Sequence, residues 1–386
     1  MTQIDKAQTL LKECGFDGWL LYDFHGSNPL ARQFLGMHPD KKTTRRFFYW
    51  VPAQGSPIKL VHAIEAHTLD ALPGEKRMYA SWSSLGVELQ AILKGAKKVA
   101  MEYSPNNAIP YVSCVDGGTV DFIRSLGHQV VSSADFLPHF TAVLTEDQIQ
   151  SQLRAAAALN HIVTHMWKWI REHLGKITEL DAQHRIVEEF HRLQFVFDHP
   201  PIVAVNAHSA LPHYEPGASL IQQGDWILID LWAKEKGGIY GDIAKVAVAG
   251  RAPSSKQAHI FQIVRTAQRA AVSLVKERLA AKKRLEGWEV DDAARSVIRN
   301  AGYGEFFTHR TGHSIEENLH GSGAHMDNLE MHDVRPLLPG TCFSIEPGIY
   351  LPGEFGVRLE LDLLIHRDGR VEISGGEQDQ VVCLLL

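Results

Sequence analysis

The sequence predicts an α+β protein of two domains, and three observations lead to this prediction. The chain has 386 residues, more than one hydrophobic core usually organises. Residues 1–144 alternate short helical and strand patterns, as an α/β domain does. Residues 145–386 combine long helical patterns with apolar hairpins, and this segregation is typical of α+β folds.

The smaller N-terminal domain is predicted from short apolar runs bounded by turn residues. The segment AQGS between two such runs is typical of a hairpin. The expected helices are 6–14, 87–93 and 120–126, and the expected strands are 18–24, 47–51, 58–61, 98–101 and 130–131. Polar residues follow or precede several strands, where ligand sites often lie, although structural roles are commoner. These residues are Asp23, His25, Asn28, Arg45 and Arg46.

The C-terminal domain is predicted to contain four long helices and two hairpins. Thr145 precedes an acidic turn and apolar residues at helical spacing, which indicates a helix N-cap. Similar patterns predict helices over 178–195, 255–279 and 290–301, the last ending before Gly302. The hairpins are expected over 226–248, around the turn KEKGG, and over 343–364, around Gly353.

Composition and charge argue against several classes of function. The net charge is −6, with both signs scattered, so neither a nucleic-acid nor a membrane partner is indicated. No apolar run approaches the length of a membrane span, and the N-terminus lacks a signal-peptide pattern. The four cysteines form no CxxC pair, which argues against a disulfide framework and a thiolate zinc site. We therefore expect a cytoplasmic protein.

The hairpin over 343–364 carries carboxylates on an otherwise apolar element. Its residues alternate with period two, and a register symmetric about Gly353 places Glu346 opposite Glu360. Facing like charges destabilise a strand pair, and a buried carboxylate is costly unless it is neutralised. A bound cation would neutralise the pair, whereas a solvated sheet face would remove the need for one.

The hairpin over 226–248 shows the same feature. A five-residue loop centred on Lys236 would place Asp230 opposite Asp242. Asp230 follows the apolar run WILI, where an unpaired charge would be expensive. Two separate hairpins with facing carboxylates are harder to explain as solvated faces, and they favour a metal site.

A third segment, THRTGHSIEENLHG, contains three histidines at spacings of four and seven. On a helix, His309, His313 and His320 would share one side, as a polar face or as part of a zinc site. Two histidines four residues apart are a weak metal motif without the HExxH pattern. Gly312 and Gly321 favour a less regular segment.

Together these residues resemble the dinuclear-metal peptidases of the pita-bread fold, which include prolidase, aminopeptidase P and methionine aminopeptidase. The resemblance is carried by the motifs TGHSIEENLH, SIEPGIY and GVRLE and covers about residues 145–386. The domain over 1–144 is similar to the accessory domain of the family's Xaa-Pro members, of the creatinase and prolidase type. The stretch from His320 to Leu351 is most similar to the small bacterial Xaa-Pro dipeptidases.

The resemblance implies two divalent metal ions, and an oxygen-rich set with one imidazole suits Mn²⁺, with Co²⁺ or Zn²⁺ as alternatives. A water bridging both ions would lose a proton and attack the peptide carbonyl. Glu346 would act as general base and then as acid, and His213 and His320 would lie near the carbonyl and the leaving group. The implied ligands are Asp230, Asp242, His313, Glu346 and Glu360, with Asp242 and Glu360 bridging both ions.

The implied substrate is a dipeptide with proline after the scissile bond. A prolyl nitrogen carries no hydrogen, so the ring has to be recognised by shape. Arg358 would bind the substrate carboxylate, or would instead neutralise Asp362 or Glu360. His309 matches a supporting position at the substrate. The resemblance also implies a homodimer.

Three departures from the family pattern stand in this sequence. The two aspartates are twelve residues apart where the family usually has eleven, DIAK replaces the frequent DITR, and Ser314 and Glu316 replace glycines.

Aminopeptidase P, which cuts the same bond in longer peptides, is the alternative within the family. Outside it, the alternatives are a pita-bread binding protein without peptidase activity and a generic zinc hydrolase that uses His309 and His313 together.

Overall fold

The computed structural model describes residues 2–38 and 40–385. The chain divides into two compact units, Met1–Thr141 and Ala142–Leu386. The domain boundary predicted after residue 144 lies near this division and stays a prediction.

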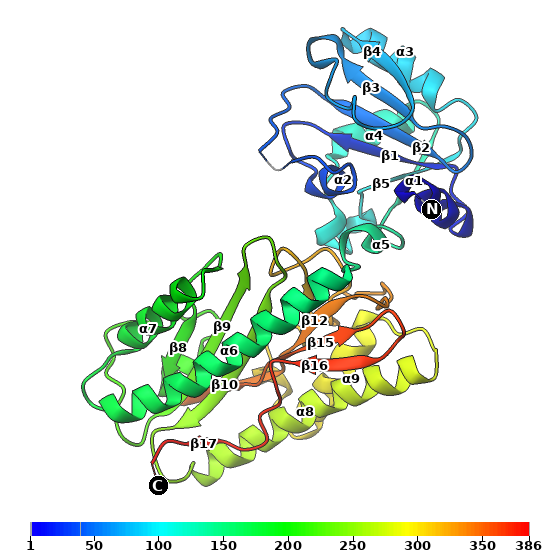
Figure 1. Cartoon of the computed structure of the whole chain (residues 1–386). Helices are drawn as coiled ribbons and strands as arrows, with labels where there is room; N and C mark the ends of the chain where they lie inside the picture. Colours follow the sequence, from blue (N-terminus) through cyan, green and yellow to red (C-terminus); the bar gives the residue numbers. More distant parts are fainter. Residues whose placement is uncertain (1, 39, 386) are drawn as a thin grey trace. The chain divides into compact units, whose positions relative to one another are not determined.

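The first unit is built on a six-stranded sheet with the order β4-β3-β2-β1-β5-β6 (Figure 1). Strand β2 is antiparallel to β1 and to β3, and the other neighbouring pairs are parallel. The strands are β1 (Gly18–Asp23), β2 (Phe47–Pro52), β3 (Ile58–His62), β4 (Glu75–Tyr79), β5 (Lys98–Met101) and β6 (Gln129–Ser132). The helices are α1 (Gln3–Glu13), α2 (Pro29–Phe34), α3 (Trp82–Ile92), α4 (Gly117–Ser125), α5 (Pro138–Thr141) and the 3₁₀ turns η1 (Ala63–Glu65), η2 (Pro105–Asn107) and η3 (Pro110–Val112).

The predicted elements of the first unit are confirmed in type, and the short helices α2 and α5, strand β4 and the 3₁₀ turns were not predicted. Helix α1 begins earlier than expected because Thr2 caps it, its hydroxyl accepting a hydrogen bond from the amide of Asp5. Strand β4 begins with three charged residues in the run EKRMY and is mostly exposed, so it lacks the apolar pattern of a buried strand.

The second unit contains four long helices and three sheets (Figure 1). The helices are α6 (Glu146–His173), α7 (Glu179–Arg192), α8 (Ser255–Ala280) and α9 (Gly287–Asn300), with 3₁₀ turns η4 (Asn206–Ala210) and η5 (Gly304–Phe306). The strands are β7 (Phe195–Val196), β8 (Ile202–Val205), β9 (Trp226–Glu235), β10 (Gly241–Val248), β11 (Ser314–Ile315), β12 (Cys342–Ile345), β13 (Gly348–Leu351), β14 (Phe355–Arg358), β15 (Leu361–Ile365), β16 (Val371–Ser374) and β17 (Val382–Cys383).

Two hydrophobic cores hold these helices against the strands. Helices α6 and α7 pack their apolar sides on β8, β9 and β10, and α8 and α9 pack on β12 to β15. The four helix predictions are confirmed to within a turn, and Thr145 caps α6 as expected, with its hydroxyl accepting from the amide of Gln148. Gly241, at the start of β10, allows a close approach, because a Cβ there would lie 2.6 Å from the backbone nitrogen of Ala156 on α6.

The hairpin over 343–364 has the predicted register but is interrupted. Strand β12 pairs with β15 and β13 with β14, and every pair is symmetric about Gly353, which adopts a φ of 75°. Pro347 follows Glu346, and proline cannot donate a ladder hydrogen bond. Glu346 and Glu360 therefore lie in the gap between the two paired segments, across from each other in the common register.

The register predicted for the hairpin over 226–248 is wrong. Asp230 pairs with Ala244 and Asp242 pairs with Trp232, so the two aspartates are diagonal neighbours instead of an opposed pair. The turn is centred on Gly237, which has a φ of 75°, instead of on Lys236. A shift of two residues keeps the same face of the strand, so both carboxylates still point to one side.

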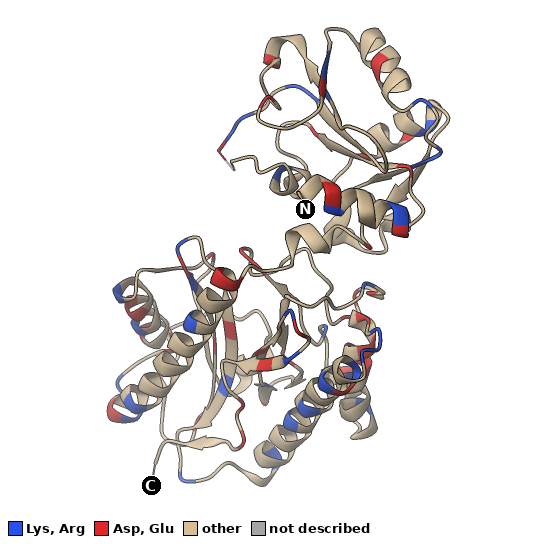
Figure 2. Cartoon of the chain, turned by 45° about the vertical axis from the view of Figure 1, so that its right-hand side comes forward, with Lys and Arg blue, Asp and Glu red and all other residues tan. Residues whose placement is uncertain are grey.

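Charged residues of both signs are scattered along the helices of each unit (Figure 2). Helix α7, for example, has an acidic first turn and a basic last turn, which suits its dipole. Among the described residues, no helix is both long and apolar enough to span a membrane.

Candidate metal centre

A cavity of about 740 Å³ in the second unit collects all the site residues predicted from the sequence. Several strands supply these residues: Asp230 lies in the middle of β9, Asp242 near the start of β10 and Arg358 at the end of β14, and Glu346 directly follows β12. The predicted residues in its lining are His213, Asp230, Asp242, His309, His313, His320, Glu346, Arg358 and Glu360.

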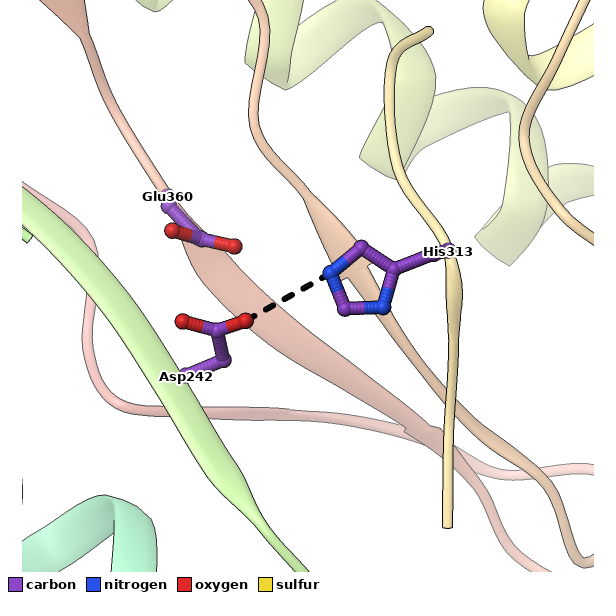
Figure 3. A group of neighbouring side chains, drawn as sticks. All are labelled: Asp242, His313 and Glu360. Atoms are coloured by element: carbon purple, nitrogen blue, oxygen red, sulfur yellow. Dashed lines mark ion pairs between the residues drawn. The ribbon is translucent and has the colours of Figure 1, made fainter. Parts of the chain in front are cut away.

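Three of the five predicted ligands form a compact, buried cluster. Asp242, His313 and Glu360 each offer one ligand atom, and these atoms all lie within 4.8 Å of one another. Their side chains converge from β10, from the segment before β11 and from the segment before β15 (Figure 3). Such spacing allows one cation to contact all three groups.

The cluster is held in place by bonds between the two hairpins. The amide of Glu360 donates to the carbonyl of Ala244 (3.1 Å), on β10. The amide of Asp242 donates to the carboxylate of Asp362 (3.0 Å), on β15. Gln152 of α6 donates to the same carboxylate oxygen (2.8 Å). These contacts join two sheets at the point where their acidic side chains meet.

Glu346 lies at the edge of this cluster. Its Oε1 is 3.5 Å from Nε2 of His313 and accepts a hydrogen bond from the hydroxyl of Ser344 (3.1 Å). The same hydroxyl accepts from the amide of His313 (3.0 Å). Gly312 makes this packing possible, because a Cβ there would lie 1.9 Å from the carbonyl oxygen of Ser344.

Asp230, the fifth predicted ligand, forms an ion pair with Arg358 through its Oδ2. From the sequence, Asp362 and Glu360 were the expected carboxylate partners of Arg358, and the structure shows Asp230 in their place. The guanidinium also donates to the hydroxyl of Tyr350 (2.9 Å). The other oxygen of Asp230, Oδ1, is buried and has no hydrogen-bond partner.

His309, His313 and His320 do not lie on a helix. This agrees with the irregular segment that Gly312 and Gly321 predicted. Nδ1 of His313 faces the carbonyl of Ser314 (3.2 Å), which leaves Nε2 as the nitrogen near Asp242, at 3.5 Å. Both nitrogens of His309 have partners, the carbonyl of Arg310 and the hydroxyl of Tyr350, each at 2.7 Å. His309 is therefore no part of the cluster, which argues against the generic zinc site.

His320 and His213 lie along the cavity wall. The ring of His320 is 4.3 Å from the ring of His313, centroid to centroid. Desolvation against the wall, with a smaller contribution from the Arg310 cation, lowers the pKa of His320 to about 4. His213 follows η4 in the lining of the same cavity.

Burial and mutual repulsion raise the pKa values of three carboxyl groups in the site. Burial, reinforced by Asp230 and other nearby carboxylates, raises the pKa of Asp242 well above its usual value. Burial likewise raises the pKa of Glu360 well above the usual value, and Asp242 adds to the shift. Burial raises the pKa of Glu346 to about 7. A bound cation would relieve this repulsion.

The donor set fits divalent metal ions. Asp230 Oδ1 and Asp242 Oδ1 are buried side-chain oxygens without a hydrogen-bond partner, and such atoms are rare in folded proteins unless something pairs with them. Carboxylate oxygens and one imidazole nitrogen are ligands that Mn²⁺, Co²⁺ and Zn²⁺ accept.

Sequence reasoning missed a second layer of residues around the site. Tyr350 joins His309 to Arg358 through its hydroxyl. Asp362 anchors β10 beside Asp242, and its only sequence signal was its alternation with Glu360 on one strand. Lys245 donates to the carbonyl of Glu360 (3.4 Å), and burial lowers the pKa of this lysine to about 8.

Glu316, one of the departures from the family pattern, organises the loop that carries His320. Its buried Oε1 accepts hydrogen bonds from the amides of Ser322 and Gly323, both at 2.8 Å, and from the hydroxyl of Ser314 (2.9 Å). A Cβ at Gly321 would lie 2.5 Å from this carboxyl group. The glutamate therefore fixes both ends of the loop between His313 and Ser322.

Comparisons with known proteins agree with this geometry. The model of metallopeptidase family M24 matches residues 151–367. The Xaa-Pro dipeptidase of Lactobacillus delbrueckii subsp. lactis is 27% identical over 381 residues, which are 95% of each chain. The Xaa-Pro dipeptidase of Lactobacillus helveticus is 38% identical over 178 residues, 46% of this chain and 45% of that relative. The crystal structure of dipeptidase PepE from Mycobacterium ulcerans has a TM-score of 0.72 at 23% identity and covers 99% of this chain and 96% of that chain.

The family match extends over more than half of the chain, and the structural likeness shows the fold. The chain belongs to metallopeptidase family M24. The predicted α+β class, with a pita-bread domain after a smaller α/β domain, is confirmed.

The assignment of His313, but not His309, to the metal centre gives a first prediction. His313→Ala should abolish binding of at least one divalent ion, because it removes a nitrogen from the cluster. His309→Ala should keep the metal content of the wild type, since both of its nitrogens bond to other groups. Elemental analysis after dialysis measures the difference, and equal losses in the two variants would support the generic zinc site instead.

The hydrogen bonds of Glu316 give a second prediction. Glu316→Gln should lower the free energy of unfolding by about 1–3 kcal/mol. The side-chain NH₂ of glutamine would be a second donor beside the backbone N–H donors of Ser322 and Gly323, where the carboxylate now accepts from both. Exposed Glu317 is the matched control, and Glu317→Gln should change stability little. Urea unfolding measures both variants, and equal stabilities would show that Glu316 does not hold the loop.

Proposed function

We propose that the protein hydrolyses Xaa-Pro dipeptides at two divalent metal ions, with Mn²⁺ as the physiological metal. The observation that supports this proposal most directly is the buried cluster of Asp242, His313 and Glu360 in the cavity of an M24 family member. The curated relatives named as Xaa-Pro dipeptidases support the choice of substrate.

The metal ligands in this proposal are Asp230, Asp242, His313, Glu346 and Glu360. When bound, the ions would supply the positive charge that activates water and polarises the peptide carbonyl. Asp230 can serve both Arg358 and a metal, because its Oδ2 faces the guanidinium and its Oδ1 has no partner. The number of ions and the bridging roles of Asp242 and Glu360 rest on the family resemblance.

Glu346 is proposed to move the protons. Its Oε1 lies 3.5 Å from Nε2 of His313, at the edge of the cluster, and accepts a hydrogen bond from the hydroxyl of Ser344. From this position its carboxylate would accept a proton from the attacking water and pass it to the leaving nitrogen. The ring nitrogens of His320 and His213, on the cavity wall, would donate to the developing oxyanion.

Arg358 is proposed to bind the carboxylate of the substrate's proline. Its guanidinium lines the cavity, and its buried Nε has no hydrogen-bond partner. A guanidinium can bind a carboxylate through two parallel hydrogen bonds. His309 would support this arrangement through Tyr350, whose hydroxyl contacts both side chains. A homodimer, which rests on the resemblance alone, and a cytoplasmic location, which rests on the scattered spacing of the four cysteines, complete the proposal.

The reaction itself gives a third prediction. Ala-Pro should be hydrolysed in the presence of Mn²⁺, and Glu346→Gln should lower kcat by about 10²-fold or more, because the amide cannot accept a proton. Glu354→Gln is the matched control, since Glu354 is exposed and pairs with Lys256. Full activity of Glu346→Gln would contradict the role of Glu346.

The length of the peptide separates the two enzymes of the family. Ala-Pro should be cleaved with a higher kcat/KM than Ala-Pro-Ala-Ala, because the proposed partner of Arg358 is a carboxylate directly on proline. Turnover of the longer peptide alone would identify an aminopeptidase P instead.

A further inference from the structure

The first unit contains a cleft of its own that the proposed reaction does not use. The cleft has a volume of about 790 Å³, within the range of small-molecule sites. It is lined by residues at the ends of β1, β3 and β4, by the residues that precede β2, and by the beginning of α4. Three of the polar residues noted at strand ends, His25, Arg45 and Arg46, lie in this lining.

The cleft lies where the topology of the sheet favours a ligand site. Strands β1, β3, β4, β5 and β6 run in one direction, because β2 is antiparallel to both of its neighbours. The cleft is lined at the carboxyl ends of β1, β3 and β4, and no residue of β5 or β6 is in its lining. Open α/β sheets bind their ligands at this carboxyl edge.

The other two polar residues at this edge have structural roles. The carboxylate of Asp23 accepts hydrogen bonds from Arg32, Thr43 and the amide of Asn28. The turn that follows brings His25 into the cleft with a φ of 56°, a left-handed conformation that is unusual for a residue with a side chain.

The lining of the cleft is positively charged. Arg45 and Arg46 form no ion pair with any described residue, and His25 and His62 lie beside them. The one acidic side chain in the lining, Asp116, is engaged as the N-cap of α4, where its carboxylate accepts from the amide and the hydroxyl of Thr119, both at 2.8 Å. Nη1 of Arg45 donates to the carbonyl and the hydroxyl of Thr44 (3.1 and 3.2 Å), and Glu65, outside the lining, accepts from the amide of Arg45 (3.2 Å). Because neither guanidinium forms an ion pair with a described carboxylate, both can still bind an anion.

The start of helix α4 also borders the cleft, where Gly118 has no side chain to cover the backbone. The negative charge that a helix N-terminus favours is supplied there by the carboxylate of Asp116, so the preference for an anion rests on the two arginines.

The rim of the cleft is aromatic. Trp82 and Phe24 line it with 83% and 43% of their surface exposed, and Tyr22, Tyr79 and Phe122 lie in the same lining. Exposed aromatic side chains next to arginines suit a ligand that combines an apolar or aromatic body with a charged group.

From these observations we infer that the cleft of the first unit binds a small organic anion, a carboxylate or a phosphate carried on an aromatic or apolar body. Arg45 and Arg46 bind the anionic group, and Trp82 and Phe24 contact the body.

Calorimetric titration of the full-length, metal-loaded protein tests this inference. The probes are benzoate and phenyl phosphate, and neutral benzyl alcohol is the control for the aromatic body alone. The double variant R45Q/R46Q should weaken binding of at least one anion by about tenfold or more. Either anion can also enter the cavity of the second unit, and the difference between wild type and R45Q/R46Q isolates the cleft. Loss with benzoate alone identifies a carboxylate, and loss with phenyl phosphate alone identifies a phosphate.

Two further variants make the result specific. R77Q should bind like the wild type, because Arg77 on β4 lies outside the lining and pairs with Glu75 and Glu88. R45K/R46K keeps the charge and should bind the anions more tightly than R45Q/R46Q. The inference is overturned if the wild type binds neither anion, if R45Q/R46Q binds as the wild type does, if benzyl alcohol binds as tightly as the anions, or if the two double variants bind equally.

Discussion

The candidate metal centre depends on the junction between two hairpins. The amide of Glu360 donates to the carbonyl of Ala244, and the amide of Asp242 donates to the carboxylate of Asp362. These bonds bring carboxylates from separate sheets to one point, where neither sheet alone could place them. Asp362 is itself buried, and one of its oxygens has no partner, so the junction depends on a polar group in a costly environment.

The charges in the cavity explain why stability and function are opposed here. Buried like charges repel one another, and an apolar core of the same volume would fold more easily. The chain compensates in part with Arg358, which pairs with Asp230, and with Ser344, which donates to Glu346. The unpaired oxygens of Asp230 and Asp242 remain, and a divalent cation is the partner that would satisfy both the charge and the missing contacts.

The sequence predicted what depends on local pattern. Helix caps such as Thr145, the period of the hairpin strands and the glycine at position 353 are local signals, and the register about Gly353 followed from them. The turn of the other hairpin was misplaced by one residue, because KEKGG offers two glycines and only the structure shows that Gly237 adopts the positive φ at its centre. The partner of Arg358 could not be predicted, since Asp230 is far away in the chain and meets it only through the packing of two sheets.

The central claim is that the buried carboxylates form a site for two divalent cations. Titration of Mn²⁺ into the metal-free protein, with thermal unfolding followed alongside, tests it most directly. Two ions should bind per chain, and the unfolding temperature should rise with Mn²⁺ concentration, because a ligand that binds only the folded state stabilises it. Absence of saturable binding, or an unfolding temperature that does not change at saturation, would contradict the claim.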